Sequence, residues 1–252
     1  MAKQAERRTQ KVQKAREDAA RQEARRRRVV LTVGGLVIVG LVAAIVWAVV
    51  RASGDPEAPA AGAEVVAPAN LGPSGAITVG ASEAPVTVRV YYDYMCPACG
   101  MFEAANGEEL KRLVDDGQAT LELWPISFLD EQSSGTQYST RAANAIATVT
   151  DGAPDAAWAM HTALYANQPE EGTEGLTDDQ IADVASSAGV PAEVVDRFTD
   201  GEFRPWVEEM TQEAFGAGVT GTPTVLVDGE AFEGDLYTTG PLTQAIESAA
   251  GG

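Results

Sequence analysis

The sequence has few residues that can bind a metal or act as a nucleophile. It contains two cysteines, Cys96 and Cys99, and one histidine, His161, among 252 residues. A zinc site needs about four protein ligands, or three with a water, and His161 lies 62 positions beyond Cys99. A c-type haem site needs a histidine directly after the second cysteine, where Gly100 stands. We therefore expect no metal and no cofactor.

Basic residues are scarce after the first fifth of the chain. Residues 1–51 carry twelve Lys and Arg against four Asp and Glu, a net charge of +8. Residues 52–252 carry six against 33, a net charge of −27. So acidic a region argues against nucleic acid as a partner. The basic arm suits anionic lipid head groups, and nucleic-acid binding by that arm is the less favoured alternative.

One long segment has no charge at all. Residues 29–50 form an apolar run of 22 residues, which as a helix would be about 33 Å long and would cross a lipid bilayer. Arg25–Arg28 precede it and Arg51 alone follows, so the positive-inside rule places residues 52–252 outside the cytoplasm. A cleaved signal peptide is less favoured, because the run exceeds a signal sequence's usual apolar length and lacks a clear small-x-small site.

These patterns predict four parts. Residues 1–28 form a basic cytoplasmic segment, 29–50 a transmembrane helix that stays as an anchor, and 51–75 an Ala, Pro and Gly-rich linker. Residues 76–252 form one α/β domain outside the membrane. We therefore expect a single-pass protein of the cell membrane.

Both cysteines lie where an apolar strand, residues 86–92, meets a helix beginning at Pro97. At a helix N-terminus, unpaired N–H groups and the helix dipole stabilise a thiolate on Cys96, and Cys99 lies one turn further on. Pro97 fits the first helical position, and Ala98 adds no charge. The spacing predicts a thiol–disulfide redox pair. A purely structural disulfide is the alternative, but so short a loop gains little from cross-linking.

The remaining pattern predicts an α/β domain that contains a helical region. After the helix to Asp116, we expect a strand at 119–126, parallel to 86–92 because a helix joins them. We expect a hairpin turn at Asp228-Gly229. The other expected elements are strands at 77–79, 224–227 and 231–233 and helices at 138–150, 154–167, 177–188, 191–199, 202–217 and 240–250, with Asp155 or Thr177 as N-caps.

Three stretches together resemble the DsbA-like branch of the thioredoxin-fold oxidoreductases. They are the CPAC motif after the aromatic-rich strand, residues 158–168 (WAMHTALYANQ), and GVTGTPTVLVDG at 218–229. The resemblance covers about residues 75–250. It implies a thioredoxin fold with a helical domain inserted at about 135–200.

The resemblance also implies roles for residues of the site. Cys96 matches the exposed nucleophile and Cys99 the resolving cysteine. Pro223 matches a proline that follows a cis peptide bond beside the cysteines, and Thr222 precedes it. Pro97 and Ala98 complete the expected site. Many relatives carry a buried acid six positions before the first cysteine, where this chain has Val90.

We therefore expect a disulfide oxidase that introduces disulfides into thiol-containing exported proteins and is re-oxidised by a separate membrane protein. An extracytoplasmic reductase or disulfide isomerase is the alternative. The non-enzyme alternative is a tethered binding module with a structural disulfide. His161 and the tryptophans Trp124 and Trp206 are expected to be structural.

Overall fold

The structure, a computed structural model, describes residues 65–251. The expected segments at 1–28 and 29–50 and most of the expected linker lie outside the described residues. Within residues 65–251, no helix is both long and apolar enough to span a bilayer. The description below concerns this part of the chain alone.

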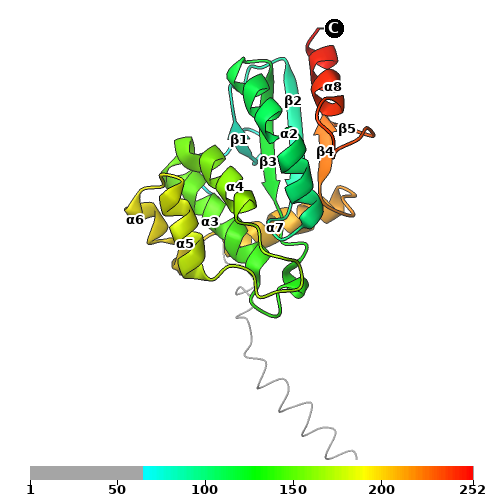
Figure 1. Ribbon diagram of the computed structural model, residues 1–252. Helices are drawn as coiled ribbons and strands as arrows, with labels where there is room; N and C mark the ends of the chain where they lie inside the picture. The colour runs from blue at the N-terminus through cyan, green and yellow to red at the C-terminus, as the bar shows by residue number, and fades with distance from the viewer. Residues whose placement is uncertain (1–64, 252) are drawn as a thin grey trace, which may run out of the picture. The chain divides into compact units, whose positions relative to one another are not determined.

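A five-stranded sheet forms the centre of the domain, in the order β1-β3-β2-β4-β5 (Figure 1). β2 and β3 are parallel, as predicted, and every other neighbouring pair is antiparallel. All seven positions of β3 are buried, which is typical of a strand covered on both faces. The strands are β1 (Ile77–Val79), β2 (Val86–Tyr92), β3 (Ala119–Pro125), β4 (Thr224–Val227) and β5 (Glu230–Ala231).

Helices cover the sheet and extend beyond it. α2 and α8 pack against each other and against the sheet, while α7 contacts both β3 and α3. Between β3 and β4, the chain forms the helical region that holds α3 to α6 (Figure 1). The helices are α2 (Pro97–Asp115), α3 (Tyr138–Gly152), α4 (Ala157–Ala166), α5 (Asp178–Ser187), α6 (Ala192–Val195), α7 (Arg204–Gly216) and α8 (Pro241–Ala250), with 3₁₀ turns η1 (Asp130–Gln132), η2 (Pro154–Ala156) and η3 (Phe198–Asp200).

Most predicted elements are present, and the differences occur in the helical region. The helix expected at 154–167 is divided into η2 and α4, and Asp155 lies within η2 instead of capping a helix. Thr177 does cap α5, in a reciprocal pair with Gln180. The expected helix at 191–199 is reduced to α6 and η3, and the last strand pairs at 230–231, not 231–233.

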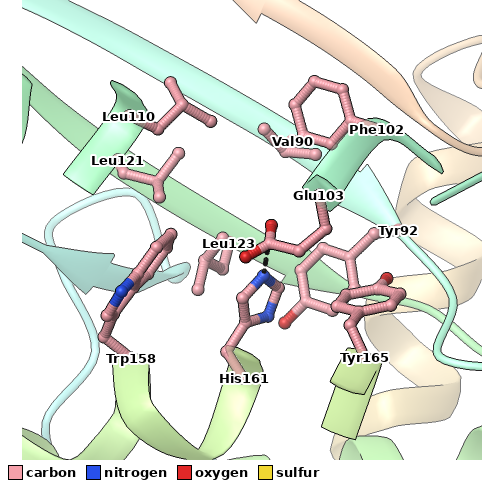
Figure 2. A pocket seen from close by; sticks show the side chains of 10 residues that line it. All are labelled: Val90, Tyr92, Phe102, Glu103, Leu110, Leu121, Leu123, Trp158, His161 and Tyr165. Carbon is pink, nitrogen blue, oxygen red and sulfur yellow. Dashed lines mark ion pairs between the residues drawn. The ribbon is translucent and has the colours of Figure 1, made fainter. Parts of the chain in front are cut away.

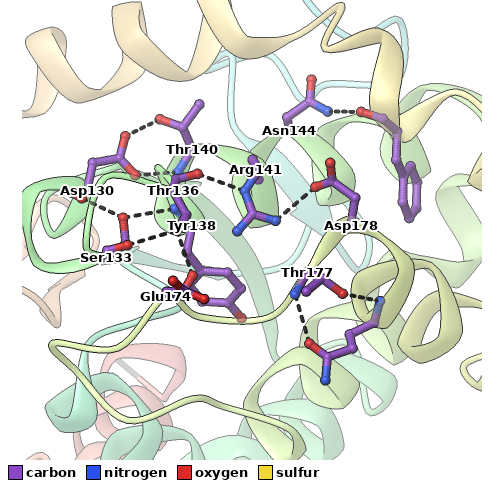
Figure 3. Close-up of polar contacts among 12 residues, drawn as sticks. Asp130, Ser133, Thr136, Tyr138, Thr140, Arg141, Asn144, Glu174, Thr177 and Asp178 are labelled. Carbon is purple, nitrogen blue, oxygen red and sulfur yellow. Dashed lines mark hydrogen bonds and ion pairs between the residues drawn. The ribbon is translucent and has the colours of Figure 1, made fainter. Parts of the chain in front are cut away.

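Polar contacts join the start of α3 to the loop between α4 and α5 (Figure 3). The Arg141 guanidinium donates to the Thr136 carbonyl (2.9 Å) and pairs with Asp178 (2.8 Å). The Thr136 hydroxyl in turn donates to the Glu174 carbonyl (2.6 Å). These contacts fix the α4–α5 loop, which begins beside the two cysteines.

Candidate active site

The two cysteines lie at the sheet edge where the parallel strands β2 and β3 end. Cys96 is the N-cap of α2, with extended backbone angles (φ −70°, ψ 115°), and Pro97 begins the helix. The Cys96 carbonyl accepts the N–H groups of Cys99 (3.0 Å) and Gly100 (3.2 Å). The Cys96 side chain is therefore beside the unpaired N–H groups of a helix N-terminus, as the sequence indicated.

The two sulfurs differ in acidity. Both cysteines are free thiols. The pKa of Cys96 is lowered to about 6, chiefly by hydrogen bonding from the Cys99 thiol and further by the Thr222 side chain and the backbone N–H groups of Cys99 and Ala98, against the opposing effect of burial. The pKa of Cys99 is raised well above the ordinary range, mainly by burial. Cys96 is thus the sulfur suited to act as a thiolate near neutral pH.

Thr222 and Pro223 lie on the loop before β4, which meets the cysteines at the same edge. The Thr222–Pro223 bond is cis, as predicted. The Cys96 thiol donates to the Thr222 carbonyl oxygen at 3.3 Å. The structure therefore brings Cys96, Cys99 and Thr222 together across 126 positions of sequence, while Pro97 is exposed and Ala98 is partly buried beside them.

Asp93 is a buried acid three positions before Cys96, and no role was predicted for it from the sequence. Its carboxylate accepts the N–H groups of Met95 (2.8 Å) and Leu129 (2.8 Å) and the Ser139 hydroxyl (2.7 Å). Burial raises its pKa to about 7, although these three donors oppose the shift. Asp93 holds the turn that leads into Cys96, since its own carbonyl accepts the Cys96 N–H.

His161 lies in a buried polar cluster beneath α2. Its Nδ1 is 3.2 Å from the Tyr94 hydroxyl, and its Nε2 is 3.4 Å from a carboxylate oxygen of Glu103. Figure 2 shows His161 from α4 directed toward Glu103 from α2, in a small cavity lined largely by aromatic and aliphatic side chains. These contacts agree with the expected structural role. Trp124 and Trp206 are also buried, as expected.

Two residues of the helical region, Tyr165 in α4 and Gln168 just after it, also contact the turn that carries Cys96. The Gln168 amide donates to the carbonyls of Tyr94 (3.1 Å) and Cys96 (2.9 Å). The Tyr165 hydroxyl donates to the Asp93 carbonyl (3.3 Å). The sequence contained Gln168 within a stretch that resembled the family, but nothing in the pattern indicated these contacts.

The described part of the chain holds no cluster of metal ligands. No group of three or more His, Cys, Asp and Glu side chains among residues 65–251 is arranged to hold a metal ion.

This combination of fold and cysteine pair defines a thioredoxin-like protein. A family model described as thioredoxin matches residues 74–247, which is more than half of the chain. The chain therefore belongs to the thioredoxin family.

Particular relatives narrow this assignment. The crystal structure of oxidised DsbA from Mycobacterium tuberculosis is 29% identical, with a TM-score of 0.61 over 70% of this chain and 93% of that one. The reduced disulfide bond oxidoreductase DsbG of the same organism is 28% identical, with a TM-score of 0.60 over 71% and 94%. Disulfide bond formation protein D of Bacillus subtilis is 28% identical over 162 residues, 63% of this chain and 70% of that protein.

One curated relative is a much longer protein, and only a small part of it matches this chain. Serine/threonine-protein kinase PknE of Mycobacterium tuberculosis is 32% identical over 117 residues, which is 45% of this chain and 21% of the kinase. The chain thus spans about a fifth of that curated relative.

Together with the disulfide relatives, the family match confirms the predicted class, a DsbA-like thiol–disulfide oxidoreductase.

Proposed function

We propose that this protein is a disulfide oxidase whose redox pair is Cys96 and Cys99. The observation that carries this proposal is the difference between the two thiols, one acidic and one held neutral by burial. A thiol of low pKa is a good leaving group, and its stable thiolate favours the reduced form of the pair. An enzyme with these properties passes its disulfide on to other proteins.

The reaction balances as a two-electron exchange. A substrate thiolate attacks Cys96 Sγ of the oxidised pair, the Cys96–Cys99 bond breaks, and Cys99 leaves and takes up a proton. The second substrate thiolate then attacks the substrate sulfur of the mixed disulfide and releases Cys96 as a thiolate. The substrate gains a disulfide and the enzyme becomes a dithiol. In this proposal Thr222 and Pro223 support the reacting sulfur from the loop before β4, and Pro97 and Ala98 support it from the start of α2.

A reductase or isomerase in the same fold is the second candidate. Ala98 favours this candidate, because it supplies no charge to stabilise the Cys96 thiolate, and a less stable thiolate makes the pair a weaker oxidant. The measured reduction potential separates the two directions. A reduction potential of about −120 mV supports the oxidase, and one of about −270 mV supports a reductase.

The proposed setting is the outer face of the cell membrane. Residues 29–50 would anchor the protein, 1–28 would remain in the cytoplasm near anionic lipid, and 51–75 would link the anchor to the catalytic domain at 76–252, with its helical insertion at about 135–200. The substrates would be thiol-containing exported proteins, and a separate membrane protein would re-oxidise the pair. The apolar run and the arginines before it support this topology.

Trapping in cells tests the function and the roles of the cysteines. Cys99→Ala should accumulate mixed disulfides with exported proteins, because the Cys96 thiolate can attack a substrate disulfide, releasing the other substrate sulfur as a thiolate, and no second cysteine of this protein can then release Cys96. Cys96→Ala is the matched control and should accumulate none. If both variants trap equally, or only Cys96→Ala does, the assigned roles are wrong. A phosphatase reporter fused after Gly252, active only outside the cytoplasm, tests the topology separately.

A further inference from the structure

The turn that carries Cys96 is held by a side chain from the helical region between β3 and β4. Gln168 follows α4, and its Nε2 donates to the carbonyls of both Tyr94 and Cys96, at 3.1 and 2.9 Å. These two acceptors lie on either side of Met95, so one amide group ties together both ends of the turn. We refer to this pair of hydrogen bonds as the Gln168 clamp.

The clamp depends on the absence of a side chain at position 100. A Cβ atom at position 100 would overlap Gln168 Oε1 and would lie 3.1 Å from its Cδ. Gly100 is inside α2, where alanine would otherwise favour the helix. The close approach gives a physical reason for glycine at this position, because a methyl group there would displace the Gln168 amide.

Gln168 is itself held in place. Its backbone N–H donates to the Tyr165 carbonyl (3.2 Å) as α4 ends, and the Tyr165 hydroxyl donates to the Asp93 carbonyl (3.3 Å). Further along the same loop, the Glu174 carbonyl accepts the Thr136 hydroxyl. The amide therefore extends from a fixed helix end, and its position follows that of the helical region.

We propose that Gln168 is a positioning residue of the redox site, which fixes the Cys96 backbone so that its sulfur faces the N–H donors of α2 and the Thr222 loop. The proposal rests on the proposed function of the cysteine pair. It assigns to the helical region a direct part in setting the reactivity of Cys96.

The physical argument concerns fixed dipoles. A thiolate is stabilised most by donors that are already oriented toward it and need not rearrange when the charge forms. The Cys96 carbonyl receives the N–H groups of Cys99 and Gly100 as well as the amide of Gln168. Without the clamp, the Cys96 backbone can move relative to the helix N-terminus. The sulfur then meets the same donors for only part of the time, and the thiolate becomes less stable.

Two independent substitutions remove the clamp, and each has a matched control. Gln168→Leu keeps the bulk and removes the donor, whereas Gly100→Ala leaves Gln168 intact and excludes its amide. Asn167→Ala changes the neighbouring exposed amide, which bonds only to the Ala163 carbonyl of its own helix. Gly216→Ala adds a methyl group to α7 at a position where, apart from the adjacent residues and the helix's own backbone, no heavy atom lies within 4 Å.

The experiment measures the pKa of Cys96 in the full chain, purified in detergent, by thiolate absorbance at 240 nm, with the oxidised protein as the blank. The equilibrium constant with glutathione and the melting temperatures of the oxidised and reduced forms are measured in parallel. We expect Gln168→Leu and Gly100→Ala each to raise the pKa by about one unit, a tenfold loss of thiolate below the pKa. The double variant should resemble either single one, because both remove the same contact.

The outcomes distinguish positioning from simple stabilisation. A purely structural role would lower the melting temperature of both redox forms equally and leave the pKa and the glutathione equilibrium at the wild-type values. That result, or additive effects in the double variant, overturns the assignment of Gln168. If the wild-type protein shows no acidic thiol and no exchange with glutathione, the proposed function itself fails, whatever the variants do.

Discussion

Thr222→Val tests how the loop before β4 makes Cys96 acidic. The Thr222 hydroxyl is buried and has no hydrogen-bond partner among the described residues, yet it lowers the pKa of Cys96. Its hydrogen is thus available to the sulfur once Cys96 ionises. Valine has nearly the same shape without the donor, so the substitution removes this interaction and leaves the Thr222 carbonyl in place.

The expected magnitude follows from the strength of one hydrogen bond to a charged group. Such a bond contributes about 1.5–3 kcal/mol, and one pKa unit corresponds to about 1.4 kcal/mol. Removal should therefore raise the pKa of Cys96 by about one to two units above its present value of about 6. At pH 6, the thiolate fraction would fall from about a half to roughly a tenth or less.

The assay is the rate of iodoacetamide labelling of the reduced protein between pH 4 and 9, with labelled positions identified by mass spectrometry. The midpoint of labelling at Cys96 reports its pKa. Thr220→Val is the matched control, because Thr220 is an exposed threonine of the same loop. If Thr222→Val labels with the wild-type midpoint, or if Thr220→Val shifts it as much, the hydroxyl is not the donor and the acidity arises elsewhere.

Three further results are expected. Labelling of the wild-type protein at pH 7 should modify Cys96 and leave Cys99 almost unmodified, because burial keeps the second thiol neutral; equal labelling would contradict the distinction. Burial raises the folded-state pKa of Asp93 to about 7, so its stabilising contribution is complete below about pH 4 and is lost as pH rises through 7. Relative to Asp93→Asn, the wild-type free energy of unfolding should fall by on the order of 3–4 kcal/mol between pH 4 and 7 in urea titrations, and parallel curves would refute this. Asn144→Ala should cost about 2–4 kcal/mol of unfolding free energy, because it leaves the Phe203 N–H and Phe198 carbonyl unpaired in the interior; a loss below about 1 kcal/mol would show that water replaces the amide.

The sequence predicted the sheet and the cysteine motif well, because the sequence patterns that indicate them are local. The apolar strand before Cys96, the cysteine spacing and the Asp228-Gly229 turn each lie within a few residues. In the structure both turn residues have positive φ, as such a hairpin turn requires. The parallel pairing of β2 and β3 followed from the helix between them.

The sequence predicted less where a feature depends on distant residues. The helix expected at 154–167 is divided after Ala156, where the 3₁₀ turn η2 meets α4, and Ala153 (φ −152°, ψ 63°) ends α3 just before it, although alanine favours helices. The Asp93 carboxylate accepts hydrogen bonds from Leu129 and Ser139, which lie 36 and 46 positions away. The approach of Gln168 to Gly100 likewise joins two parts of the fold. No periodicity in the sequence encodes such contacts.

The separation of the two active-site loops has a consequence for biosynthesis. Cys96 and Thr222 are 126 positions apart, and the whole helical region is made between them. At about 5–20 residues per second, roughly 6–25 s pass between synthesis of the first cysteine and of Thr222. During that interval the growing chain lacks the Thr222 loop, and for much of it the Gln168 amide as well, so two of the groups that surround Cys96 in the folded protein are missing. The surroundings of Cys96 are therefore complete only after the loop before β4 has been made and has folded onto the first cysteine.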